Sequence, residues 1–108
     1  MREPEFRDLY RRGLSGLDNL QGAEIVGFTG WVIMAMRCWE SFYFQHKEGI
    51  FDDHLMEGWS KQYRDMFGYK GVQEVWRLRK HQFNQDFRDY AELQLKKEAA
   101  QPLYPFRE

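Results

Sequence analysis

The sequence contains little cysteine and little proline, and the shortage of cysteine limits the bonds and metal sites that the chain can form. Its 108 residues include one cysteine, Cys38, and three prolines. A single thiol excludes an internal disulfide and any metal site that needs several cysteines, and it fits a reducing compartment. Cys38 is followed by a tryptophan and has no histidine at helical spacing, which predicts a packed, unreactive thiol.

Long apolar runs are also missing. The most apolar stretch, residues 25–36, is interrupted by Gly27, Thr29 and Gly30 and falls short of the roughly 20 residues that a membrane-spanning helix needs. The first six residues carry charge, and no apolar stretch follows them, so they do not resemble a signal peptide. The sequence therefore predicts a soluble, cytoplasmic chain that does not itself insert into a membrane.

Neither sign of charge is in excess. Sixteen basic and 17 acidic side chains give a net charge of -1, which provides no field to attract nucleic acid or an anionic membrane. A basic cluster at residues 77–81 lies between Trp76 and Phe83. Helical periodicity assigns the two aromatic side chains to a buried face and leaves the basic side chains on a solvated one. We therefore expect no nucleic-acid partner.

Aromatic residues, in contrast, are abundant. Apolar residues make up 43% of the chain and aromatic residues 18%, so a few helices can enclose a dense core. A chain of this length removes roughly two-thirds of its unfolded surface from water when it folds. These features predict a single all-α domain over residues 1–108 that folds without a metal ion, a cofactor or a disulfide.

Helical spacing of apolar residues predicts four helices, two of them in the first half of the chain. The first runs from about Pro4, a residue suited to the first helical position, to about Gly13. The second begins near Gln21, whose spacing to Glu24 forms an imperfect capping box, and runs to about residue 47. The glycine that follows two residues later predicts the end of this helix.

The third predicted helix has the clearest start. The side chain of Asp52 can cap it while Phe51 packs against Met56, and it ends before the turn at residues 68–71. The fourth helix is expected to be long, from 72 to about 100. Its apolar stripe consists of Val72, Trp76, Phe83, Phe87 and Tyr90.

Short turns predict that neighbouring helices are antiparallel. We therefore expect a compact antiparallel helical bundle of three main helices with a shorter N-terminal helix. From about residue 102, Pro102 and Pro105 prevent further helix and predict an extended tail. The tail carries three large apolar side chains that would pack on the bundle or on a partner: Leu103, Tyr104 and Phe106.

The order of these residues resembles a large family of bacterial proteins of uncharacterised activity, in which one N-terminal membrane span precedes a small helical domain. The resemblance covers about residues 4–95. It rests on residues 9–14 (LYRRGL), on Arg37, Glu40, Tyr43, Phe44 and Gln45, on residues 49–52 (GIFD), and on Trp59, Gly71, Trp76, Phe83 and Phe87. The chain departs from the family pattern at Met56, Lys70 and Gln73 and lacks the membrane span.

The resemblance implies a topology rather than a reaction. In similar proteins the stretch after the span is usually basic, which places the helical domain on the cytoplasmic face of the inner membrane. The family has no established activity, so the resemblance assigns no catalytic or cofactor-binding residue.

Arg37 and Glu40 are the first candidate site. They lie three residues apart in an apolar part of the second predicted helix, where they could form a partly buried pair that reaches toward the helix opposite. An enzyme could use such a carboxylate. No second acid or nucleophile lies at a fixed offset, so we favour a polar clamp that fixes the register of two helices.

A metal site is the second candidate. Six possible ligands surround the turn between the second and third helices: His46, Glu48, Asp52, Asp53, His54 and Glu57. Only His54 and Glu57 share a helical face, and the Glu-x-x-His element of di-iron bundles is missing. Helix capping by Asp52 explains part of this cluster, so we expect no bound metal.

A stripe of small residues marks the second predicted helix. Ala23, Gly27 and Gly30 lie at helical spacing, which lets another helix approach closely. The neighbour could be the first helix or a second copy of the chain, and the spacing does not distinguish these.

Two functions remain after these steps. We favour a non-enzymatic interaction or scaffolding domain, which forms a homo-oligomer or binds a protein partner through its helix faces and aromatic tail. The alternative is a small-molecule-binding or enzymatic domain with a pocket between the three longer helices. Its lining would be Trp39, Tyr43, Trp59 and Trp76.

Overall fold

The computed structural model describes residues 2–97, and all regular structure in this part of the chain is helical, as the sequence predicts. The tail residues Leu103, Tyr104 and Phe106 lie outside the described residues. Within residues 2–97 there are five α-helices and two single-turn 3₁₀ helices, in the order α1 (Glu3–Ser15), η1 (Leu17–Asn19), α2 (Ala23–Lys47), α3 (Asp53–Met66), α4 (Lys70–Arg79), η2 (Lys80–Gln82) and α5 (Gln85–Leu95).

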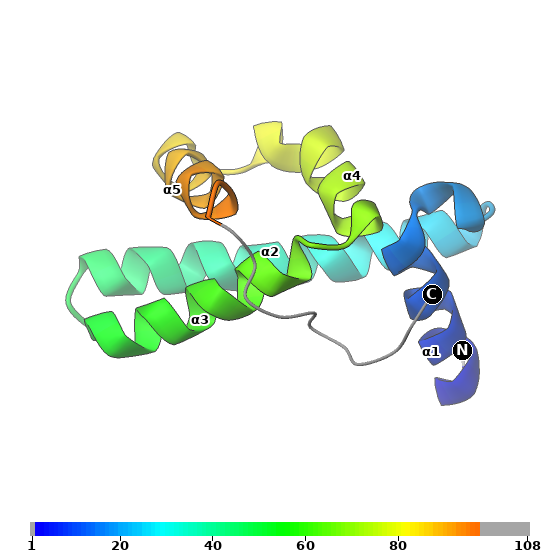
Figure 1. Cartoon of the computed structure of the whole chain (residues 1–108), viewed down its shortest axis with the longest axis horizontal. Helices are drawn as coiled ribbons and strands as arrows, with labels where there is room; N and C mark the ends of the chain where they lie inside the picture. The colour runs from blue at the N-terminus through cyan, green and yellow to red at the C-terminus, as the bar shows by residue number, and fades with distance from the viewer. Residues whose placement is uncertain (1, 98–108) are drawn as a thin grey trace.

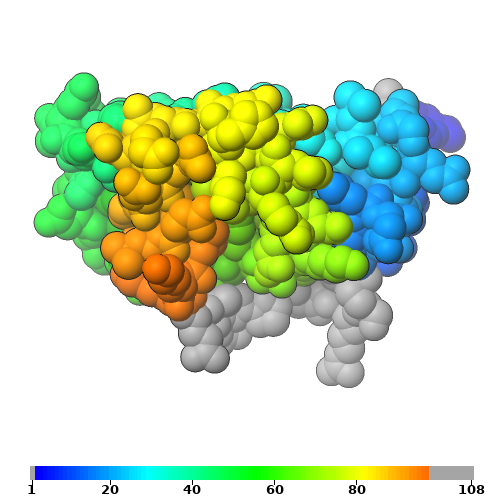
Figure 2. All heavy atoms as spheres, turned by 90° about the horizontal axis from the view of Figure 1, so that it is seen from above, coloured from blue at the N-terminus to red at the C-terminus, as the bar shows by residue number. Residues whose placement is uncertain are grey.

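The long helix α2 organises the molecule. Figure 1 shows α3 beside α2 along the long axis, α4 and α5 on one side of α2, and α1 across the N-terminal end of α2. Figure 2, viewed from above, shows α4 and α5 side by side between that end and the turn that joins α2 to α3. One side of α2 therefore supports most of the fold.

Local signals end α2 and start α3 where the sequence predicts. Gly49 takes the left-handed conformation, with φ of 80°. The amide of Gly49 bonds the carbonyl of His46 at 3.0 Å, and the amide of Ile50 bonds that of Gln45 at 2.9 Å, which together close the helix end. Asp52 then caps α3, because its Oδ1 accepts the amide of Leu55 at 2.8 Å.

The prediction of one long fourth helix over residues 72–100 is wrong, and with it the count of three main helices. Helix α4 ends at Arg79, and α5 starts anew after Asn84, whose side chain accepts the amides of Asp86 at 2.8 Å and Phe87 at 3.3 Å. An Asn side chain competes with the helix for backbone donors, which favours a cap over a helix interior. Both segments still direct their aromatic residues into one core, so periodicity alone could not reveal the break.

The core is aromatic and centres on Trp39 of α2, which is wholly buried. Its ring stacks on Tyr63 of α3 with centroids 4.6 Å apart and meets Phe87 of α5 edge to face at 5.4 Å. Such pairs add roughly 0.5–1.5 kcal/mol each beyond area burial. Further side chains from all five α-helices complete the core, among them Leu9, Leu14, Phe28, Val32, Met36, Met56, Val72, Val75, Trp76 and Ala91.

Helices α1 and α4 cross at two glycines. A Cβ atom added to Gly71 would overlap the carbonyl of Gly13, and one added to Gly13 would overlap the ring of Phe28. The missing side chain of Gly71 therefore lets α4 touch the backbone of α1, and the missing side chain of Gly13 makes room for the Phe28 ring of α2.

Gly71→Ala is expected to lower the free energy of unfolding by about 2 kcal/mol or more, or roughly 10 °C in melting temperature, because the overlap involves backbone that cannot move aside. The matched control is Gly58→Ala in α3, where an added Cβ meets open space. That change should raise stability by up to about 1 kcal/mol. Thermal melts of the two variants should move in opposite directions, and equal shifts would contradict the close crossing.

Candidate functional site

Arg37 and Glu40 connect α2 to the junction between α4 and α5. Arg37 donates from Nη1 to Glu40 Oε1 at 3.0 Å and from Nη2 to the carbonyl of Gln82 at 3.1 Å, and its guanidinium lies 4.1 Å from the centre of the Phe83 ring. Glu40 Oε2 accepts the amide of Asn84 at 2.9 Å. The pair thus holds the segment at which the predicted fourth helix breaks.

This geometry assigns the pair a structural task. Both carboxylate oxygens of Glu40 accept hydrogen bonds, one from Arg37 on the same helix and one from the amide that precedes α5. The Glu40 side chain is 17% exposed and that of Arg37 is 46% exposed. A half-exposed Arg37 is screened by water, so most of the stabilisation comes from the bond that Glu40 accepts from the amide of Asn84, the cap residue of α5.

The four aromatic residues considered for a pocket do not converge on one cavity. Trp39 and Trp76 are 0% and 5% exposed and fill the core. Trp59 packs on Phe42 with centroids 4.7 Å apart, near the turn between α2 and α3. Tyr43 packs on Tyr90 at 4.9 Å and lines an open surface hollow of about 390 Å³. These side chains chiefly contact other aromatic rings.

Several of the residues considered as metal ligands have structural partners. His46 Nε2 lies 2.7 Å from Asp53 Oδ1, which ties the end of α2 to the start of α3, while Asp52 is the α3 cap. Within residues 2–97, no three His, Cys, Asp or Glu side chains are grouped closely enough to hold a metal ion.

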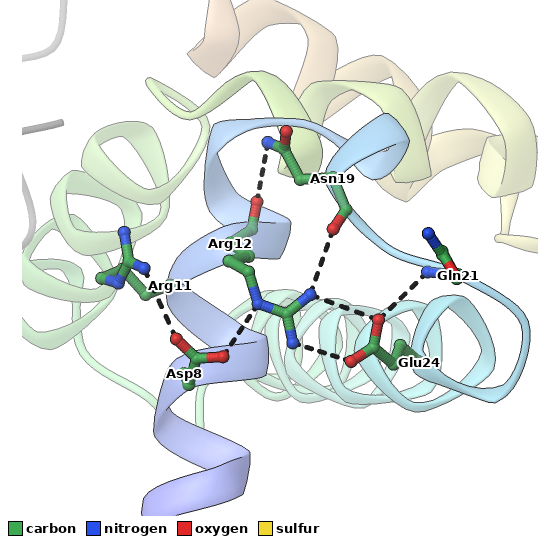
Figure 3. Close-up of polar contacts among 6 residues, drawn as sticks. All are labelled: Asp8, Arg11, Arg12, Asn19, Gln21 and Glu24. Carbon is green, nitrogen blue, oxygen red and sulfur yellow. Dashed lines mark hydrogen bonds and ion pairs between the residues drawn. The ribbon is translucent and has the colours of Figure 1, made fainter.

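A polar cluster that the sequence did not reveal is centred on Arg12. Its guanidinium contacts Glu24 through two bonds, Nη2 to Oε2 at 2.7 Å and Nη1 to Oε1 at 3.2 Å, and Nε donates to Asp8 Oδ2 at 2.9 Å. Nη1 also donates to the carbonyl of Asn19 at 3.1 Å. Figure 3 shows how this one side chain joins α1, η1 and the first turn of α2.

The electrostatics of the cluster follow from these bonds. Hydrogen bonds from Arg12 lower the pKa of Glu24 and the pKa of Asp8 below their ordinary values, and the same bonds raise the pKa of Arg12. Glu24 Oε1 also accepts the amide of Gln21 at 3.1 Å, which is one half of the predicted capping box. In the sequence, only the adjacent arginines Arg11 and Arg12 of residues 9–14 drew attention to this cluster, because no spacing rule links Arg12 to Glu24.

The remaining candidate is an exposed apolar surface on the first half of α2, which we call the α2 face. It consists of Ala23, Val26, Gly27, Gly30, Trp31 and Met34. Val26 is 73% exposed, Met34 64% and Trp31 48%. A Cβ atom added at Gly27 or at Gly30 would meet nothing within 4 Å. The small-residue stripe therefore does not serve the packing of α1 or of any other described helix.

Two further observations define this face. No charged residue occurs between Glu24 and Arg37. Cys38 is exposed, so the prediction of a packed thiol is wrong. The prediction failed because Cys38 lies about 100° around the helix from the buried Trp39 and so does not share its buried face. Cys38 lies one helical turn after the exposed Met34 and shares that face. Among the helices of residues 2–97, none is long and apolar enough to cross a bilayer.

Glu40→Ala is expected to lower the melting temperature by several degrees. The change removes the acceptor of the Asn84 amide and leaves Arg37 without its carboxylate, a loss of about 1–2 kcal/mol. Glu48→Ala, at an exposed carboxylate just after α2, is the control and should change stability by less than about 0.5 kcal/mol. Equal melts for the wild type and Glu40→Ala would show that the clamp does not stabilise the fold.

The Arg12 cluster predicts a pH-dependent stability. Carboxylates with lowered pKa stabilise the fold above their unfolded values, near pH 4, and this contribution is lost as pH falls through the folded values. Arg12→Met should therefore unfold at a lower urea concentration than the wild type at pH 7. The difference between the two urea midpoints should narrow below about pH 4. The control is Arg7→Met, which removes a longer, exposed pair of 3.8 Å with Glu3 and should give a smaller gap throughout. A gap that is the same at every pH would contradict the prediction.

Comparison with protein families, with curated proteins and with solved structures finds no match to this chain. The resemblance drawn from the sequence motifs therefore stays a prediction, and the candidate site stands on its geometry alone.

Proposed function

We propose that the chain is a non-enzymatic interaction or scaffolding domain, built as an antiparallel helical bundle, which docks a helix of another protein molecule on the α2 face. The observation that carries the proposal is the exposure of this face. Val26, Trp31 and Met34 present apolar area to water beside two glycines that have no packing partner among the described residues.

The energetics of the face favour a missing partner. A glycine inside a helix costs up to about 1 kcal/mol relative to alanine, and Gly27 and Gly30 recover none of that cost through close packing in the described part of the chain. Full burial of a side chain the size of Val or Met contributes roughly 1.5–3 kcal/mol. A helix that approached closely over the glycines would therefore bury the neighbouring side chains.

The polar chemistry of the described residues supports the non-enzymatic reading. Burial raises the pKa of Tyr63, whose hydroxyl donates to the carbonyl of Ala35 at 2.7 Å. Burial also raises the pKa of Tyr90, whose hydroxyl shares a hydrogen bond with Ser60. Phenols with raised pKa that bond to other core groups stay neutral and hold helices together, rather than acting as acids or bases near pH 7.

The cellular setting is proposed from the resemblance. We place the domain in the cytoplasm and, in longer relatives that carry a membrane span, on the cytoplasmic face of the inner membrane. There it would act by bringing protein molecules together.

A photo-crosslinking amino acid at Met34 tests the docking function directly. Benzoylphenylalanine at this position should form covalent protein adducts in living cells on irradiation, seen as bands of higher mass on a denaturing gel. The control is the same amino acid at Leu93 of α5, which is 57% exposed compared with 64% for Met34. Adducts that are no more abundant at Met34 than at Leu93 would contradict a docking role for the α2 face.

A further inference from the structure

We infer that the occupant of the α2 face is the same face of a second copy of this chain, with the two α2 helices packed antiparallel about a two-fold axis. This inference rests on the proposed docking function and names its partner. It follows from the order of side-chain sizes along α2 and from the direction of the helix dipole.

Side-chain size changes along the face. The first half carries Ala23, Gly27 and Gly30 beside one larger side chain, Val26, and the second half carries Trp31, Met34 and, one turn on, the exposed Cys38. An antiparallel pair places the glycines of each copy against Trp31 and Met34 of the other. A parallel pair would place tryptophan against tryptophan and methionine against methionine, which would hold the helices apart where the glycines allow close approach. The face is thus self-complementary in the antiparallel sense, as a two-fold interface requires.

The helix dipoles favour the same orientation. The uncharged stretch begins after Glu24 and ends before Arg37, but each of these charges already has a partner within the chain, Arg12 and Glu40 respectively. They therefore do not decide the orientation. An antiparallel pair sets the two helix dipoles in opposite directions, whereas a parallel pair would align them unfavourably.

Helix α1 extends the surface beyond one helix pair. Phe6 of α1 meets Trp31 edge to face with centroids 5.4 Å apart, so α1 borders the face. A specific interface buries about 800 Å² on each partner, which is more than six side chains of one helix provide. The N-terminal half of α1 would supply further contacts around Trp31.

The composition of the face favours a protein helix over a lipid surface. A helix that lies in a membrane interface carries bulky apolar residues and a polar face rich in Lys and Arg. The α2 face carries two glycines, which offer lipid little apolar area, and one basic residue at its border, Arg37. Glycines do, however, let two helix backbones approach closely.

The first test is the mass of the purified full-length chain. Light scattering should give a dimer for the wild type and a monomer for Met34→Glu, which places a charge on the face. The control Leu93→Glu, at the exposed leucine of α5, should remain a dimer. Circular dichroism spectra of the two variants at room temperature should match that of the wild type, so that loss of the dimer is separated from loss of folding. A Met34→Glu chain that stays dimeric would overturn the inference.

The second test uses the single native thiol to read orientation. In the antiparallel pair the two Cys38 residues lie about 15 residues apart along the helix, or roughly 22 Å, too far for a disulfide. Ala23→Cys should instead bond across the interface to Cys38 of the partner subunit under mild oxidation, which gives a covalent dimer on a non-reducing gel. Gly58→Cys, at an exposed helical glycine of α3, is the matched control and should not. Cross-linking of the wild type through Cys38 alone would show a parallel pair and overturn the inference.

The remaining outcomes separate the inference from the proposed function. A monomeric wild type with Met34 adducts to another protein would overturn self-association and leave the docking function standing. A chain that ends at Gln101 and dimerises when the full chain does not would assign the face to the tail of the same chain. Binding to anionic vesicles that Met34→Glu abolishes, without a dimer, would assign it to lipid. A monomer with no Met34 adducts would remove both proposals.

Discussion

The burial of Trp39 is the constraint on which the rest of the structure depends. Its ring has no exposed surface and lies between Tyr63 of α3 and Phe87 of α5. To enclose it, α3, α4 and α5 must all pack on the same side of α2, where Phe28, Val32 and Met36 also lie. Dense packing of this kind tolerates little change in volume. The opposite side of α2 is therefore not used by the described core, and it is the side that carries the α2 face.

Polar side chains fix the ends of the segments that cover the core. Arg12 joins α1 to the first turn of α2, and Glu40 holds the start of α5. Each of these bonds joins elements that apolar contacts alone would leave free to slide, because the hydrophobic effect is not directional. Two phenols have the same task, because the hydroxyl of Tyr63 bonds to the carbonyl of Ala35 and that of Tyr90 to Ser60.

The fold was predictable where the signal is local. The Asp52 cap, the Gly49 helix end and the helical class all depend on residues within one or two turns of each other. Contacts that join distant segments were not predictable. The spacing of Arg12 and Glu24 does not predict their ion pair. The helix break after Arg79 could not be predicted because the spacing of the aromatic residues continues through it. The Arg37 and Glu40 pair was foreseen because both residues lie on one helix, but their partners at the start of α5 were not.

The core and the α2 face lie on opposite sides of one helix, and this separates two kinds of residue on α2. The side chains that face the core are apolar and two of them, Phe28 and Trp39, are aromatic, so their volume is set by what α3, α4 and α5 can enclose. The side chains of the α2 face are not limited in this way, yet they combine open glycines with exposed Trp31 and Met34. A monomeric helix would gain stability from alanine in place of those glycines and solubility from charge in place of the large apolar residues. This surface is unfavourable for a monomer on both counts, and it is complementary to itself in the antiparallel direction. A second α2 helix packed against it best explains both properties.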